Sequence, residues 1–182
     1  GMHGKVKIFD RNLERLRSVD HHFRGQLETV ASSQYAIEEA CLEADIVIGA
    51  VLVVGAKAPK LVSNELVSRM RPGSVLVDIS VDQGGCFEAT RPTTHSDPVF
   101  ELNGSIFYCV ANMPGAVPHT STHALANATL PYTMELARHG WRTAVLQDSA
   151  LAEGVNVVHG AVTYGPVAEA HEITATPLSS LL

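Results

Sequence analysis

The sequence lacks the features that mark disulfide-rich, membrane and nucleic-acid-binding proteins. Its 182 residues include three cysteines, which are widely spaced and form no CxxC pair, so a reducing, cytoplasmic setting is expected. No apolar run approaches the roughly 20 residues that a membrane span needs, and the first residues lack the apolar segment of a secretory signal. Lys and Arg number 13 against 19 Asp and Glu, without a basic block, so no nucleic-acid partner is expected.

The residues that are present are typical of a globular domain, with 46% hydrophobic and 18% charged. Strand-like apolar runs alternate with stretches whose apolar residues recur at helical spacing. The strand-like runs are 5–9, 26–30, 45–54, 74–80 and 105–110, and the helical stretches are 13–23, 37–44 and 63–70. This alternation predicts an α/β fold, a Rossmann-like doubly wound parallel sheet with helices on both faces. The run 45–54 is continuously apolar, which predicts a strand buried on both faces.

A long stretch without charge follows the last of these strands. No Asp, Glu, Lys or Arg occurs between residues 102 and 134, and residues 120–140 predict a helix that is apolar nearly all round, with a kink at Pro131. Such a helix is expected to be buried on every side, against a second domain or subunit. We therefore expect a nucleotide-binding domain over 1–118 and a helical region over 119–182, whose last 30 residues are peripheral.

Polar residues follow three of the predicted strands, at the sheet edge where open α/β proteins bind ligands. Asp10 ends the first strand, although an acid there is more often a helix cap or a solvated turn. The run VDISVDQGGCFE at 77–88 brings carboxylates and a Gly-Gly pair to the end of another strand. A strand-end turn explains Asp82 and the glycines equally well. Asn112 follows the last strand and offers an amide to a ligand.

Other chemistry has little support in the sequence. His119 and His123 have the i,i+4 spacing of a zinc pair, but no third ligand is evident, so no metal is expected. There is no GxSxG motif, and neither Cys86 nor Cys109 has a histidine close by in sequence, so a nucleophilic mechanism is not expected.

Three segments carry a specific resemblance. They are DIVIGAVLVVGAKAPKLVS at 45–63, RPGSVLVDISVDQGGCFEATRPTTHSDPVFE at 71–101 and YCVANMPGAVPHTSTHALANATLPYT at 108–133. They resemble the nucleotide-binding domain and C-terminal region of bacterial alanine dehydrogenases, a family that also includes the transhydrogenase alpha subunit. The resemblance implies reversible, NAD-dependent deamination of L-alanine to pyruvate and ammonium. The DQGG and RPTTH segments resemble alanine dehydrogenase more than transhydrogenase.

The resemblance also implies roles for individual residues. Asp82 matches the family's catalytic aspartate, which handles protons beside the substrate. Asp10 would bind the adenosine ribose and favour NAD, whereas Arg11 and Arg15 leave NADP open. The full set of implied cofactor-binding residues is Asp10, Arg15, Ser32, Val51, Leu52, Ile79, Val110, Asn112 and Met113.

The chain departs from the family pattern at its N-terminal side. The Gly-rich loop, the first strand of the sheet and the domain that supplies a catalytic lysine and histidine are all missing. In the order of such sheets, the missing strand would lie between the strand ending at Asp10 and the strand at 45–54. We therefore expect a homo-oligomer or a complementing N-terminal chain as partner, and no turnover by the 182 residues alone. A non-catalytic assembly module and a transhydrogenase-type NAD-binding subunit stay open as alternatives.

Overall fold

A computed structural model describes residues 4–51, 53 and 58–182 of the chain. The described residues form two compact units, one of residues up to 51 and from 58 to 111, the other from residue 112 onward. The predicted division at residue 118 falls inside the second unit. Each unit is described by itself below.

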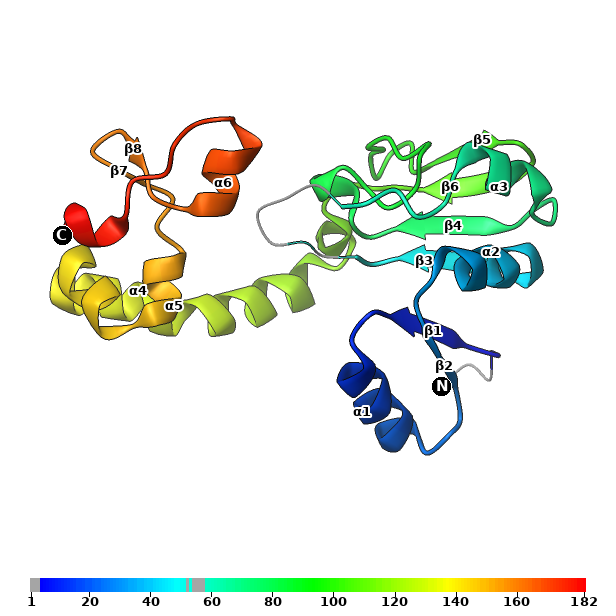
Figure 1. Ribbon diagram of the computed structural model, residues 1–182, viewed down its shortest axis with the longest axis horizontal. Coiled ribbons are helices and arrows are strands. Elements are labelled where there is room, and N and C mark those ends of the chain that lie inside the picture. Colours follow the sequence, from blue (N-terminus) through cyan, green and yellow to red (C-terminus); the bar gives the residue numbers. More distant parts are fainter. Residues whose placement is uncertain (1–3, 52, 54–57) are drawn as a thin grey trace. The chain divides into compact units, whose positions relative to one another are not determined.

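The first unit contains two sheets. Strands β1 (Lys7–Asp10) and β2 (Glu28–Ala31) form a parallel pair, and a four-stranded sheet has the order β3-β4-β6-β5 (Figure 1). Its strands are β3 (Ile46–Gly49), β4 (Val75–Asp78), β6 (Ser105–Tyr108) and β5 (Val99–Leu102), of which only β5 is antiparallel to its neighbour. The carboxyl ends of β3, β4 and β6 therefore lie along one edge, as predicted. The two sheets are separate in the described residues, and the predicted strand position between β1 and β3 stays a prediction.

Side-chain caps set where the helices of the first unit begin. Asn12 accepts a hydrogen bond from the Arg15 N–H at the start of α1 (Leu13–Phe23), which confirms the predicted cap. Ser33 and Ser63 cap α2 (Gln34–Glu43) and α3 (Asn64–Arg69) in the same way. Each cap pairs an N–H that the first helical turn leaves without a partner, which contributes about 1 kcal/mol.

The core of the first unit lies on one face of the four-stranded sheet. Helices α2 and α3 lie on the same side of this sheet (Figure 1). Cys41 of α2 and Val67 of α3 pack there in one cluster with Leu76 and Phe107, and both of these sheet residues are 0% exposed. Each large apolar side chain buried in this way contributes about 1.5–3 kcal/mol.

The opposite face of the sheet corrects a prediction. Strand β3 was expected to be buried on both faces, yet Ile46 and Ile48 are each 61% exposed. They stand in register with Val75 and Val77 of β4, which are only half-buried. The expectation was wrong because both α2 and α3 pack on the other face of this sheet.

Strand β5 was not predicted. It pairs with β6 as a hairpin closed by Asn103 and Gly104, both of which have positive φ angles, 52° and 77°. An Asn-Gly pair between two apolar runs is a strong hairpin signal, so this element was readable from the sequence.

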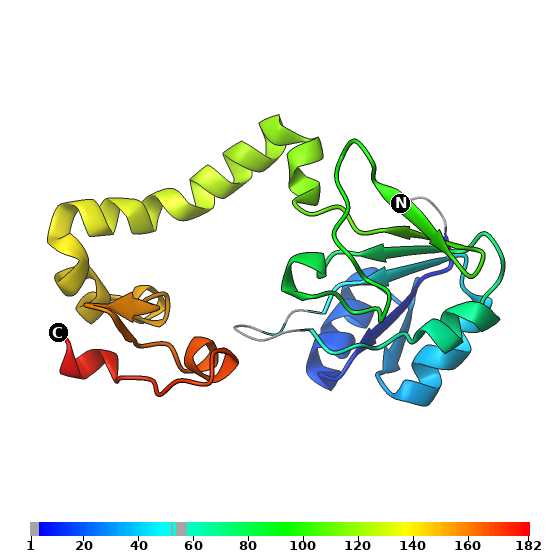
Figure 2. The same ribbon diagram turned by 90° about the horizontal axis from the view of Figure 1, so that it is seen from above.

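The second unit is built around the long helix α4 (Pro118–Gln147). Its other elements are η2 (Met113–Ala116), α5 (Ser149–Glu153), the hairpin of β7 (Val157–Val158) and β8 (Ala161–Val162), α6 (Gly165–Ala170) and η3 (Leu178–Ser180). The helix contains Pro131, but the residue with non-helical angles is Gly140, with φ 70° and ψ 158°. The ribbon changes direction in its yellow part, which contains that glycine (Figure 2). Glycine adopts this conformation without a steric penalty.

The second unit by itself does not bury this helix on every side, and its predicted covering by a second domain or subunit stays a prediction. Leu125 is 66% exposed and Leu146 is 71% exposed, while Ala144 and Val145 are buried. The described residues of the second unit therefore leave much of the apolar surface of this helix uncovered. No helix among the described residues combines the length and the apolar character that crossing a membrane requires.

Candidate functional site

Asp10 lies at the carboxyl end of β1 together with two other predicted residues. Its Oδ1 accepts a hydrogen bond from the Asn12 N–H at 2.8 Å, and its Oδ2 pairs with the Arg15 guanidinium at 3.2 Å. Ser32 follows β2 directly, and its N–H donates to the carbonyl of Asp10 at 3.0 Å. The parallel pairing of β1 and β2 thus brings Asp10, Arg15 and Ser32 together, and their role in binding a cofactor stays a prediction.

The groups around Asp10 favour the ionised form of its carboxyl group. The Asn12 N–H above all, and then the Arg15 guanidinium, hold the pKa of the Asp10 carboxyl below its ordinary value of 3.8. Its side chain is 26% exposed, so its remaining lone pairs are accessible to hydroxyl donors. The Arg15 side chain is 69% exposed, which makes the ion pair weak.

Asp82 lies on a single 3-10 turn, η1 (Val81–Gln83), which follows β4 after two residues. The side chain is exposed at the carboxyl edge of the sheet, where the sequence placed it. Ser80 ties this turn to the segment after β3, since its hydroxyl donates to the Val51 carbonyl at 2.7 Å. A carboxylate so placed can accept or release a proton on a bound molecule, and this role stays a prediction.

The backbone conformation of the glycines beside Asp82 has a cause within the protein. Gly84 and Gly85 have φ angles of 87° and 76°, which favour glycine. A Cβ atom at Gly85 would lie 2.6 Å from Asp78 Oδ2 and would also overlap the Thr90 side chain. The sequence suggested a close approach of backbone to a ligand at these glycines. At Gly85 the close approach is to Asp78 and Thr90.

The apolar residues implied to line the site differ in their access. Ile79 is 54% exposed beside Asp82, and Val51 is half-buried. Val110 is 0% exposed, so its side chain packs inside the unit, and its predicted contact with a cofactor stays a prediction. Leu52 lies outside the described residues.

Asn112 and Met113 belong to the second unit. Asn112 is exposed and adopts a left-handed conformation, with φ 56°, that begins η2. Asn and Gly tolerate this conformation better than other residues, so the backbone accounts for an asparagine here. Met113 is half-buried at the first position of η2.

Two residues that the sequence did not single out hold the turn of Asp82. Asp78, 0% exposed at the end of β4, accepts hydrogen bonds from the N–H groups of Ser80 and Cys86. Lys60 donates to the carbonyls of Gly84 and Phe87. The Asp78–Ser80 contact spans two residues, but the Asp78–Cys86 contact spans eight and the Lys60–Phe87 contact spans 27. No local pattern signals these longer contacts.

The part of the chain that the structure describes shows neither a metal-ligand group nor a reactive cysteine thiol. No three His, Cys, Asp or Glu side chains gather there in a metal-binding group. The rings of His119 and His123 are in edge contact, with centroids 4.8 Å apart. All three cysteines are free and buried, and burial raises the pKa of Cys41 and Cys109 to about 11, which disfavours the reactive thiolate.

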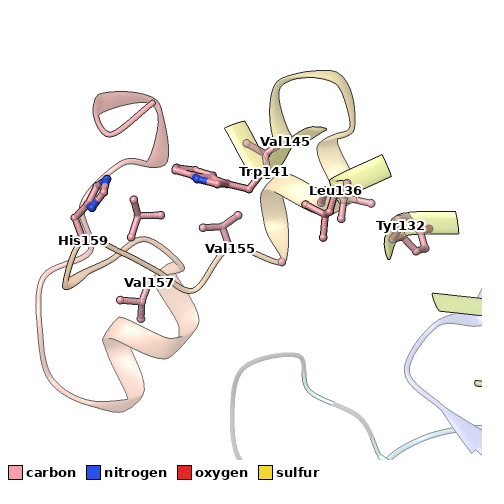
Figure 3. A pocket seen from close by; sticks show the side chains of 11 residues that line it. Tyr132, Leu136, Trp141, Val145, Val155, Val157 and His159 are labelled. Carbon is pink, nitrogen blue, oxygen red and sulfur yellow. The ribbon is translucent and has the colours of Figure 1, made fainter. Parts of the chain in front are cut away.

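The second unit contains a pocket of its own, of about 600 Å³ (Figure 3). Its lining comes from α4, α5 and the segment around β7, and includes Leu136, Trp141 and Val155. Of the eleven lining residues, only Tyr132 and His159 have titratable side chains. This composition suits an apolar group better than acid–base chemistry.

Comparisons with known proteins place this geometry in a family. The model of the family "Alanine dehydrogenase/PNT, C-terminal domain" matches residues 1–165. The alanine dehydrogenase of Mycolicibacterium smegmatis is 54% identical over 182 residues, which are 100% of this chain and 49% of that protein. The alanine dehydrogenase of Geobacillus stearothermophilus is 50% identical over 183 residues, with the same coverage. The chain thus spans about half the length of the curated relatives it matches.

Solved structures agree with this result. An L-alanine dehydrogenase matches with a TM-score of 0.81 and 47% identity, over 93% of this chain and 46% of that one. A transhydrogenase from Sinorhizobium meliloti matches with a TM-score of 0.60 and 22% identity, over 88% of this chain and 42% of that one. The first match confirms the predicted Rossmann-like α/β fold, and the second shows similarity of fold alone.

Proposed function

The chain belongs to the family of the alanine dehydrogenase/PNT C-terminal domain, and from this we propose that it is the cofactor-binding half of an NAD-dependent L-alanine dehydrogenase. The reaction would convert L-alanine, NAD⁺ and water to pyruvate, ammonium, NADH and a proton. The observation that carries the proposal is the exposed carboxylate of Asp82 at the carboxyl edge of β4. That is the edge at which folds of this kind bind nucleotides and substrates.

The corner at Asp10 fits the adenosine end of NAD. An ionised carboxylate with accessible lone pairs accepts hydrogen bonds from the two ribose hydroxyls and repels a phosphate on either of them. Because Arg15 already pairs with Asp10, it favours NADP less than a free arginine would. Ser32 is proposed, from the resemblance, to lie at the same adenosine end of NAD. Val51, Leu52, Ile79, Val110, Asn112 and Met113 are proposed, from the resemblance, for the rest of the cofactor.

Asp82 would manage charge and protons at the substrate. When bound, the nicotinamide ring supplies the hydride chemistry, which leaves alanine as a cationic imine. The negative charge of Asp82 stabilises that cation. During hydrolysis the carboxylate accepts a proton from the attacking water and returns it to the nitrogen, which then leaves as ammonia. The new hydroxyl loses its proton as the pyruvate carbonyl forms, and this proton converts the ammonia to ammonium. A carboxylate is needed because a neutral amide can neither offset the cation nor accept the proton.

The rest of the substrate site would come from residues outside these 182. By the resemblance, a lysine and a histidine of another domain complete the substrate site, so we expect the 182 residues alone to show no turnover. Exposed apolar residues on α4, such as Leu125 and Leu146, favour assembly with a complementing N-terminal chain or with further copies of the chain. The three reduced thiols fit a cytoplasmic location.

A chimera tests the proposal. The N-terminal half of the Mycolicibacterium smegmatis alanine dehydrogenase is fused ahead of this chain, and NADH consumption is followed with pyruvate and ammonium. We expect turnover by the chimera and none by the isolated chain. Asp82→Asn in the chimera should lower kcat by at least about 100-fold, and the exposed helix variant Asp20→Asn should not.

Two results would change the assignment. A folded chimera that oxidises NADH with a second nucleotide, and not with pyruvate and ammonium, identifies a transhydrogenase-type subunit. A folded, oligomeric chimera without hydride transfer to either acceptor identifies a non-catalytic assembly module. Turnover by the isolated chain would contradict the expected need for a partner.

A further inference from the structure

The segment that carries Asp82 is held by a buried carboxylate on one side. Both oxygens of Asp78 accept N–H groups of this segment, Oδ1 from Ser80 at 3.0 Å and Oδ2 from Cys86 at 2.8 Å. The Thr90 hydroxyl donates to Oδ2 as well. These contacts fix residues that precede and follow Asp82 in the sequence to one side chain, that of Asp78, which is 0% exposed.

The same segment is held on its other side by residues 58–62. The N–H of Ala58 donates to the Gln83 carbonyl at 3.0 Å, and the N–H of Leu61 donates to the Cys86 carbonyl at 2.7 Å. Between them, the Lys60 ammonium donates to the Phe87 carbonyl at 2.9 Å and to the Gly84 carbonyl. The carboxylate therefore binds N–H groups of the segment, and the ammonium binds its carbonyls.

We propose that Asp78 and Lys60 are positioning residues that together fix the place of the Asp82 carboxylate at the substrate. This inference rests on the proposed function of Asp82. The Asp78 carboxylate accepts hydrogen bonds from N–H groups of the segment, and the Lys60 ammonium donates hydrogen bonds to its carbonyls. Neither side chain can therefore replace the contacts of the other. Asp82 itself is exposed, and its position is set by its own backbone and by these anchors.

Lys60→Met is the first test, because the side chain lies near the surface and the change removes the ammonium while keeping similar length. Lys5→Met is the matched control, since Lys5 is exposed on the same unit. Hydrogen exchange of the isolated chain should show faster exchange at the Leu61 and Cys86 amides, on the order of 10-fold, in Lys60→Met alone.

The chimera then separates positioning from simple stability. Lys60→Met should lower kcat on the order of 10- to 100-fold and leave the KM for NADH within about twofold, because only Asp82 is displaced. Lys60→Arg should recover most of kcat, since a guanidinium can donate to both carbonyls. Asp78→Asn should behave like Lys60→Met. The asparagine amide keeps one acceptor oxygen, and its NH₂ group then faces an N–H donor of the segment, so one hydrogen bond is lost.

Specific results would overturn the inference. Unchanged exchange in Lys60→Met refutes the anchoring. Faster exchange with unchanged kcat, or a rise in the KM for NADH alone, refutes the positioning of Asp82. An unsubstituted chimera without turnover refutes the proposed function and the catalytic consequence with it, while the exchange experiment still decides whether the anchors hold the turn.

Discussion

Replacing Gly85 by alanine should destabilise the first unit strongly. Gly85 has φ 76°, and an added Cβ would lie 2.6 Å from Asp78 Oδ2 and would overlap Thr90. The left-handed conformation costs an alanine about 1–2 kcal/mol, and forcing atoms into a filled space costs about 1–3 kcal/mol more. We therefore expect a loss of roughly 2–5 kcal/mol.

Gly73→Ala separates the two contributions. Gly73 also has a positive φ, 82°, but a Cβ there would meet no heavy atom within 4 Å. It should therefore cost only the conformational part, about 1–2 kcal/mol. Hydrogen exchange at the Leu76 and Phe107 amides, which report on the sheet of this unit, measures the opening free energy of both variants. Equal losses in the two variants would refute the packing around Gly85.

Three further predictions concern pH, thiols and the open face of the sheet. Because the folded pKa of Asp10 lies below its ordinary 3.8, its stabilisation is complete above 3.8 and is lost as pH falls through the folded value. Exchange of the α1 amides against pH should show this loss, and Asp10→Asn should remove it. At pH 8, Cys41 and Cys109 should react with a disulfide reagent only in denaturant, because burial raises the pKa of both to about 11. Ile48→Thr should cost under about 1 kcal/mol in urea unfolding of the isolated chain, whereas Leu76→Ala should cost about 2–5.

The sequence was sufficient where local patterns have local causes. Asn12 before a helical stripe predicted a cap, and the alternation of apolar runs and helical stripes predicted the parallel sheet. The place of Asp82 at a strand end followed from the same pattern. The hairpin of β5 and β6, which was not predicted, also has a local signal in Asn103 and Gly104.

Only the tertiary structure decided features that depend on contacts between distant residues. A buried Asp78 cannot be told from a solvated one in sequence, because its partners, such as Thr90, reach it only when the chain folds back. The 61% exposure of Ile48 likewise depends on which sheet face the helices cover, and both faces of its strand look alike in sequence. Local chemistry thus determined which helices and strands form and which acids lie at the strand ends. Long-range packing determined which of their side chains are buried, hydrogen-bonded to distant residues or exposed.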